Sequence, residues 1–74
     1  MIYKENDIVM YISPNFGKYI IKVIKYLGSN QYEYKLLYRD KRYDTLIVGK
    51  IYIHSFPSER SKVISKEEYI MEML

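Results

Sequence analysis

The chain has 74 residues, no cysteine and a formal net charge of +3, so it has room for one small domain, residues 1–74, without disulfides or thiolate zinc sites. Its hydrophobic share of 49% and its mixed charges exclude a disordered chain. No apolar run approaches the ~20 residues of a membrane span or forms a signal peptide, so we expect a cytoplasmic domain that does not insert into a membrane.

Five β-prone runs follow one another along the chain, each marked by alternating apolar residues and bounded by turn residues. They are Asp7–Ile12, Lys18–Leu27, Gln31–Tyr38, Thr45–Ile53 and Ser61–Ile64. Gly49 falls inside the fourth run and predicts a bulge or a break into two short strands.

The second and third runs are predicted to form a β-hairpin around the sequence GSN. A loop of two or four residues pairs Val23 with Leu36 and Ile21 with Tyr38, apolar against apolar, whereas a loop of three turns Lys35 toward the core. The inner face is then Ile21, Val23, Tyr34 and Leu36, with Tyr34 opposite Lys25 and with Tyr32 and Tyr38 near the two ends. The outer face is predicted to hold Lys22, Ile24, Tyr26, Glu33, Lys35 and Leu37.

The last ten residues, SKEEYIMEML, predict a helix. Ser65 and Glu68 form a capping box, in which the serine is the N-cap. An apolar stripe at helical spacing follows, made of Tyr69, Ile70, Met73 and Leu74. Because so short a helix is unstable alone in water, the stripe is expected to pack on the open end of its own barrel or on a partner chain.

Five short strands, brief turns and a terminal helix predict a mainly β fold, a small five-stranded SH3-like barrel with a short C-terminal helix. An OB-fold normally needs longer strands, and the sequence offers no recognition helix for a winged helix-turn-helix domain.

The first half of the chain, NDIVMYI followed by GKYIIKVIKYLGSNQYEYKLLYRD, resembles the opening of Tudor- and KOW-type SH3-like barrels. Asp7 and Val9 match the first-strand pattern of these families, Asn6 replaces its glycine, and Tyr19 stands at the position of its aromatic residue.

The Tudor resemblance implies an aromatic cage for methylated arginine or lysine. Tyr19 and Tyr38 match two of its roughly four aromatic positions. Ser13 and Lys41 stand at the other two, and neither supplies a π face, so the resemblance does not imply a complete cage.

Along its full length the chain resembles the YorP family of small Bacillus phage and prophage proteins, particularly in KYLGSNQYEYKLLYRDKRYDTLIV and FPSERSKVISKEEYI. This resemblance implies a five-stranded SH3-like barrel with a helix, located in the cytoplasm of a bacterial host. It implies no molecular function.

The residue inventory disfavours catalysis. His54 is the one histidine, and its neighbour Ser55 points to the opposite face of a strand, so we expect His54 to be structural or exposed. The acidic residues are scattered, apart from Glu67 and Glu68 at the helix start, and the three glycines form no phosphate loop. We expect no enzyme, no cofactor, no metal site and no small-molecule substrate.

The positive charge is concentrated in the middle of the chain. Residues 18–50 hold eight basic and three acidic residues, a net charge of +5. Lysines attract phosphates and tyrosines stack on bases, so this segment predicts a nucleic-acid-binding face, although a lysine-rich face is also ordinary for a solvated sheet. The predicted binding face comprises Tyr19, Lys22, Tyr26, Lys35, Leu37, Tyr38, Arg39, Lys41, Arg42 and Tyr43.

The alternative is a protein–protein interaction module that engages a host or phage protein. Ile24 and Leu37 beside Tyr26 would form an exposed apolar strip, which is typical of partner surfaces. The basic charge excludes a DNA mimic. Nucleic acid and protein both stay open as partners, and so does the oligomeric state.

Overall fold

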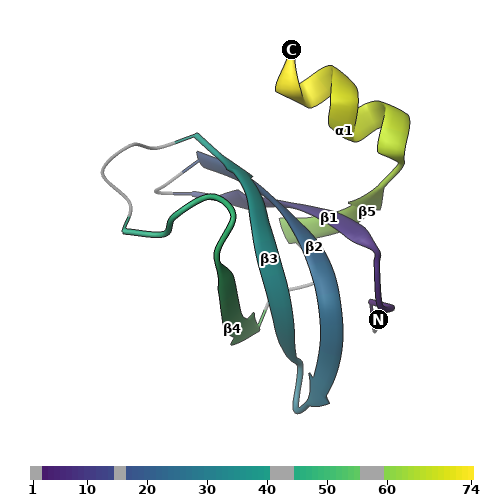
Figure 1. Ribbon diagram of the computed structural model, residues 1–74, viewed down its shortest axis with the longest axis vertical. Helices are drawn as coiled ribbons and strands as arrows, with labels where there is room; N and C mark the ends of the chain where they lie inside the picture. Colours follow the sequence, from purple (N-terminus) through teal and green to yellow (C-terminus); the bar gives the residue numbers. More distant parts are fainter. Residues whose placement is uncertain (1–2, 15–16, 41–44, 56–59) are drawn as a thin grey trace.

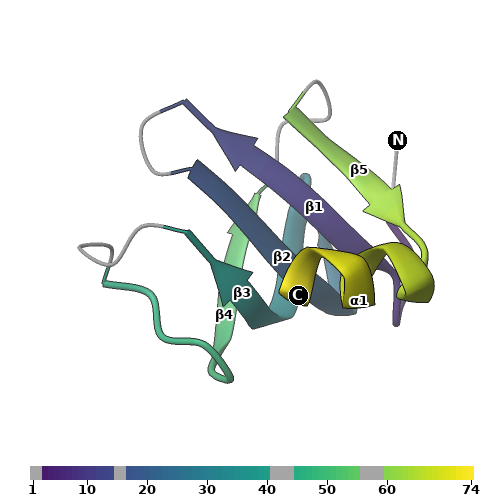
Figure 2. The ribbon, with the colours of Figure 1, turned by 90° about the horizontal axis from the view of Figure 1, so that it is seen from above.

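The computed structural model describes residues 3–14, 17–40, 45–55 and 60–74. Its strands form one antiparallel sheet of five, in the order β4-β3-β2-β1-β5, followed by one helix (Figures 1 and 2). The elements are β1 (Ile8–Ser13), β2 (Gly17–Gly28), β3 (Gln31–Arg39), β4 (Ile51–Ser55), β5 (Ser61–Ile64) and α1 (Lys66–Met73). This confirms the predicted mainly β fold with five strands and a short C-terminal helix. The sheet bends like a barrel but stays open, because no ladder in the described part joins β4 to β5.

The fourth strand is shorter than predicted because a turn precedes it. The N–H of Lys50 donates to the carbonyl of Ile47 at 3.2 Å, and Gly49 has a φ of 94°. Gly49 N–H donates to the Leu36 carbonyl at 2.7 Å, while the Leu36 N–H donates to the Lys50 carbonyl at 3.0 Å. Gly49 and Lys50 therefore lie opposite the single residue Leu36, which defines a β-bulge with the glycine in the left-handed region. The predicted bulge at Gly49 is confirmed.

The predicted register of the hairpin is wrong. Val23 pairs with Tyr34 and Ile21 pairs with Leu36, so each pairing is displaced by two residues from the prediction, which set Ile21 against Tyr38.

Bulges cause this displacement. The loop itself has two residues, as one of the predicted loop lengths requires, and both Ser29 and Asn30 have positive φ, which suits a tight hairpin turn. Leu27 and Ile24 are then extra residues in β2, and Leu37 is an extra residue in β3. The two bulges in β2 move the register by two residues, and a shift of two leaves the side chains from Ile21 to Val23 and from Tyr34 to Leu36 on their predicted faces.

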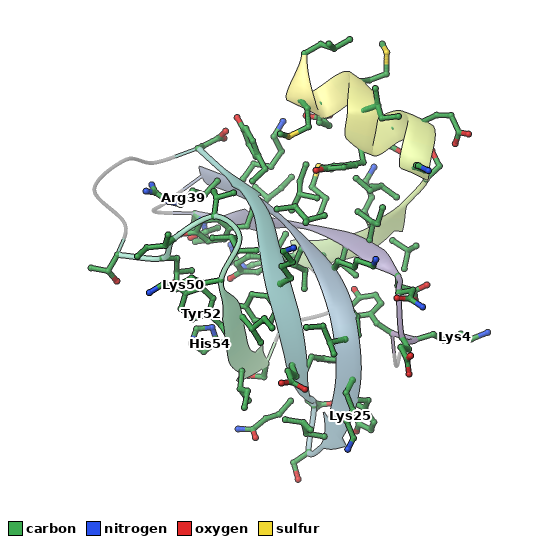
Figure 3. The ribbon with its side chains drawn as sticks, viewed as in Figure 1. Lys4, Lys25, Arg39, Lys50, Tyr52 and His54 are labelled. Carbon is green, nitrogen blue, oxygen red and sulfur yellow. The ribbon has the colours of Figure 1, made fainter. Side chains whose placement is uncertain are left out.

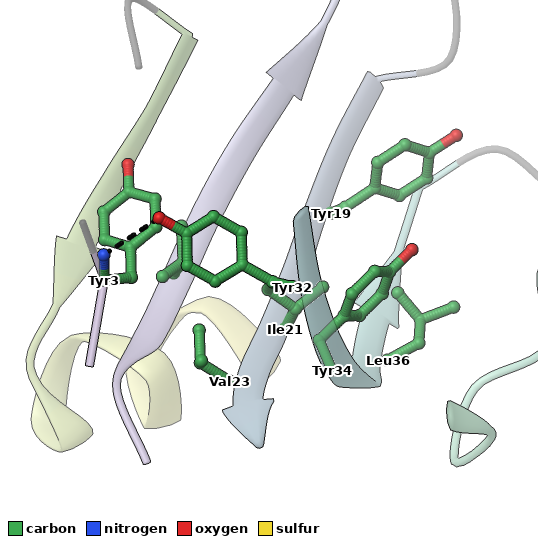
Figure 4. Close-up of a cluster of buried hydrophobic side chains, with 8 residues drawn as sticks. Tyr3, Tyr19, Ile21, Val23, Tyr32, Tyr34 and Leu36 are labelled. Atoms are coloured by element: carbon green, nitrogen blue, oxygen red, sulfur yellow. Dashed lines mark hydrogen bonds between the residues drawn. The ribbon is translucent and has the colours of Figure 1, made fainter. Parts of the chain in front are cut away.

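The predicted inner face is consequently buried although its pairings differ. It forms one side of the sheet, here called the core side, together with aromatic residues from β2, β3 and the N-terminal segment (Figure 4). The N–H of Tyr3 donates to the hydroxyl of Tyr32 at 3.1 Å, which fastens this segment to the sheet. The core cluster comprises Tyr3, Val9, Tyr19, Ile21, Val23, Tyr32, Tyr34 and Leu36.

The opposite side of the sheet carries α1 and is here called the helix side. Met10, Ile20 and Ile64 form a second buried cluster there, and Tyr69 of α1 packs on it. The N-cap prediction is confirmed, since the Ser65 hydroxyl accepts the N–H of Glu68 at 3.0 Å.

Of the predicted apolar stripe on α1, Tyr69 alone packs on the sheet clusters. Ile70 and Met73 are about half exposed, and Leu74 is 96% exposed. Lys18 of β2 pairs with Glu72 and adds a polar contact between sheet and helix. In the part of the chain that the structure describes, no helix is long and apolar enough to cross a membrane.

Candidate nucleic-acid interface

The bulges divide the predicted binding face between the two sides of the sheet. Lys22, Lys35, Leu37 and Tyr38 belong to the helix side, while Tyr19, Tyr26 and Arg39 belong to the core side. Lys41, Arg42 and Tyr43 lie outside the described residues. The seven described residues therefore do not lie on one side of the sheet.

The outer position predicted for Tyr26 is wrong. Leu27 and Ile24 are both extra residues in β2. The side chains between them therefore point to the side of the sheet opposite to the predicted one. Tyr26 packs on the core cluster, with its ring centroid 5.1 Å from that of Tyr32. Tyr19, on the same side, is only 7% exposed and stacks on Tyr11, so its ring has little surface for a ligand.

Tyr19 and Tyr38, the two residues that match aromatic-cage positions of the Tudor families, lie on opposite sides of the sheet and do not face one another. The bulge at Leu37 turns Tyr38 to the helix side, where it packs with the second cluster opposite Ile20. Arg39 becomes the cross-strand partner of Tyr19 and is half-buried on the core side.

The apolar strip predicted from Ile24 and Leu37 is not an exposed surface. Both residues are bulged and half-buried. Leu37 packs on the second cluster beneath α1, where Tyr69 also packs.

Tyr38 takes part in a polar network at the edge of the helix side. Its hydroxyl donates to the carboxylate of Asp40, and this hydrogen bond raises the pKa of Tyr38 above its ordinary value. The Nζ of Lys18 lies 6.0 Å from the centre of the Tyr38 ring and bonds to Glu72, which raises the pKa of Lys18. These contacts hold Tyr38 in place.

Lys22 and Lys35 are direct cross-strand partners, and both are exposed on the helix side. Within the described residues, neither ammonium group contacts a carboxylate. The next basic residue along β2, Lys25, lies opposite Glu33 instead. The two facing lysines thus concentrate positive charge at the middle of the hairpin.

A shallow groove of about 550 Å³ begins at Lys22 and runs beside the start of α1. Lys66 and Lys22 line the groove together with the carboxylate residue Asp7, and Tyr69, Leu37 and Ile8 provide an apolar surface. We call this the helix-side groove. It combines two cations and one carboxylate with one aromatic ring, so the lysines favour an anionic ligand that has a planar or apolar part.

Residues of β4 and the lysine before it form a second basic and aromatic surface, which was not among the predicted site residues. Lys50, Tyr52 and His54 alternate along the edge of the sheet (Figure 3). The rings of Tyr52 and His54 are 6.3 Å apart and inclined by 4°, and His54 Nδ1 shares a hydrogen bond of 2.7 Å with the Tyr34 hydroxyl. The alternation of KIYIH was the signal that could have identified them.

We predicted that His54 is structural or exposed, and in the structure it is exposed and hydrogen-bonded. Across the described ranges, no three His, Cys, Asp or Glu side chains are grouped so that they could hold a metal ion. Comparison of the chain with protein-family models, curated proteins and solved structures gives no match.

Proposed function

We propose that the chain is a non-catalytic binding module that binds nucleic acid through Lys22, Lys35 and Lys66 on the helix side. The observation that carries this proposal is the register of Lys22 and Lys35. Like charges directly opposite each other destabilise a sheet, and a polyanion is the ligand that turns this repulsion into attraction.

The helix-side groove supports the same ligand. Phosphates would contact Lys22 and Lys66, while the half-buried ring of Tyr69 lies beside them at the groove surface. Proteins that bind single strands combine a positively charged groove with aromatic rings on which bases stack, each stacked base contributing roughly 1–3 kcal/mol. We therefore expect single strands to bind more tightly than duplexes.

The non-catalytic part of the proposal rests on the residue inventory. The single histidine shares its Nδ1 with Tyr34, and no nucleophile is paired with it in the described structure. The resemblance to the YorP family adds the expectation of a phage or prophage protein that acts in the cytoplasm of a bacterial host.

Fluorescence anisotropy with labelled single- and double-stranded DNA and RNA tests the proposal at about 50 and 200 mM salt. We expect affinity to fall steeply as salt rises, and Lys22→Glu or Lys35→Glu to weaken binding and flatten the salt dependence. Lys50→Glu is the matched control, because it makes the same charge change at the residue just before β4, in line with Tyr52 and His54 (Figure 3). Absence of binding at the lower salt concentration, or equal losses in all three variants, contradicts the proposal.

A protein partner is the second candidate, and a different surface favours it. The outward face of α1 exposes four apolar residues: Ile70, Met71, Met73 and Leu74. Met71→Lys should then abolish binding of a protein partner and leave nucleic-acid affinity unreduced, whereas Lys35→Glu should do the reverse.

A further inference from the structure

Within the described residues, the outer edge of β4 has backbone groups without a strand partner. Among the described strands, β4 pairs with β3 alone. The hydrogen bond from the Leu36 N–H to the Lys50 carbonyl fixes the phase of this ladder, in which bonded and non-bonded pairs alternate. It follows that Ile51, Ile53 and Ser55 direct their N–H and C=O groups away from β3.

The side chains of β4 leave this edge unprotected. Ile51 and Ile53 are 56% and 53% exposed, and the strand has neither a charged residue nor a proline. Natural edge strands are usually blunted by such residues, because an open apolar edge pairs with other strands. The opposite edge, β5, does carry a charge, Lys62, which lies 3.7 Å from Glu68 of α1.

We propose that β4 pairs antiparallel with β4 of a second copy of the chain, about a two-fold axis at Ile53. In this register Ile53 lies opposite itself, Ile51 lies opposite Ser55 and Tyr52 lies opposite His54. All three outward-facing residues of each strand are then hydrogen-bonded across the axis. The interface is isologous, so it closes as a dimer and leaves no edge of β4 for further chains.

A second copy matches this edge in charge and in side-chain type. Ile51–Ser55 contains no aspartate, glutamate, lysine or arginine, so the two strands bring no such charges into contact. The two isoleucines at the axis cover one another, and an aromatic pair forms on each side of the axis on the core side.

Other registers of the two β4 strands leave backbone groups unpaired or set unlike side chains opposite each other. A shift to an axis at Tyr52 leaves the backbone groups of Ser55 unpaired and sets Lys50 against His54. A one-residue slip sets core-side residues against helix-side residues. A five-residue ladder buries less than the ~1,200 Å² of a standard interface, so we expect a weak dimer with a Kd above about 10 µM.

The proposed dimer does not depend on nucleic-acid binding. A two-fold axis perpendicular to the sheet places both helix sides on the same face of a continuous sheet. The lysine pairs Lys22–Lys35 of the two copies would then lie on one surface, each separated from the axis by β4.

Sedimentation velocity between about 5 and 500 µM protein tests the dimer. The wild-type chain should shift from monomer to dimer over this range, and Ile53→Lys should weaken association at least tenfold, since it sets two ammonium groups face to face. Val63→Lys is the matched control, because Val63 is 47% exposed on the other edge strand. A wild-type chain that stays monomeric throughout, or a dimer that survives Ile53→Lys, overturns the proposal.

A cross-linking experiment is independent of the lysine variants. The chain has no cysteine, so Ile53→Cys can form a disulfide only with a second copy. Opposed residues at a hydrogen-bonded position have Cα atoms about 5.5 Å apart, within the range of a disulfide. Ile53→Cys should cross-link at least tenfold faster than Val63→Cys under mild oxidation, and equal rates overturn the proposal.

Discussion

Lys22 of β2 and Lys35 of β3 lie directly opposite each other on adjacent strands, and both are exposed. Lys25, on the same side of the sheet, lies opposite Glu33 instead. A pair of like charges in direct register opposes folding, while the neighbouring Lys25–Glu33 pair favours it. Under the proposed function, the same charge that destabilises the hairpin attracts the ligand. This relationship allows the contributions of Lys35 to binding and to stability to be separated.

Lys35→Glu is expected to stabilise the fold while it weakens nucleic-acid binding. The substitution replaces a repulsive cross-strand pair with an attractive one, which should raise the free energy of unfolding by up to about 1 kcal/mol. Urea denaturation followed by circular dichroism measures the change. The double variant Lys22→Glu/Lys35→Glu restores repulsion and should lose the gain. A Lys35→Glu variant that is less stable than wild type contradicts this account.

Removing the hydroxyl of Tyr32 is expected to destabilise the core. That hydroxyl accepts the buried N–H of Tyr3, and Tyr32→Phe would leave this donor without its partner, at a cost of about 1–3 kcal/mol in the free energy of unfolding. Tyr26→Phe is the matched control, since the Tyr26 hydroxyl accepts only an exposed N–H, that of Asn30, at 3.5 Å. Equal losses in the two variants would show that the bond to Tyr3 contributes nothing.

Local sequence signals predicted several features of the fold correctly. Gly49 marked the bulge before β4, because only a flexible residue suits the positive φ of that position. Ser65 marked the start of α1, since its hydroxyl suits the first unpaired N–H groups of a helix. Alternation also identified Ile21, Val23, Tyr34 and Leu36 as buried residues of β2 and β3. In each case the physical cause acts within a few residues.

The bulges at Ile24, Leu27 and Leu37 could not be predicted from alternation. Each inserted residue is apolar and suits either face of a sheet, so the periodicity carries no mark of the insertion. The consequence falls on the candidate site, because Tyr26 and Tyr38 changed sides while Lys22 and Lys35 did not. The sides predicted for Tyr26 and Tyr38 were wrong because the register depends on contacts between distant segments.

Gly17→Ala is expected to destabilise the start of β2 more than Gly28→Ala destabilises its end. Both glycines have positive φ, so an alanine at either position costs about 1 kcal/mol or more through backbone strain. A Cβ at Gly17 would also lie 2.9 Å from the Cβ of Asp40, whereas nothing lies within 4 Å at Gly28. Thermal unfolding should show a lower Tm for Gly17→Ala. Equal melting temperatures would mean that Asp40 moves without cost.

Stability is expected to fall in alkaline solution through Tyr38 and Lys18. The hydrogen bond to Asp40 raises the pKa of Tyr38 in the folded chain, and the bond to Glu72 raises the pKa of Lys18. A group whose pKa is higher in the folded state holds its proton more tightly there, so it stabilises the fold below its unfolded pKa. That contribution is lost as the pH rises above the ordinary pKa values of tyrosine and lysine, 10.0 and 10.5, and through the higher folded values.

Urea denaturation at intervals between about pH 8 and pH 12 measures this loss. Glu72→Gln removes the carboxylate that holds the proton on Lys18, and Tyr38→Phe removes the titrating phenol, so each variant should show a shallower decline than wild type. Because Lys18 and Glu72 are partly exposed, the decline should also become shallower at high salt, which screens their attraction. Variants that lose stability as steeply as the wild type would show that other tyrosines and lysines of the chain account for the alkaline transition.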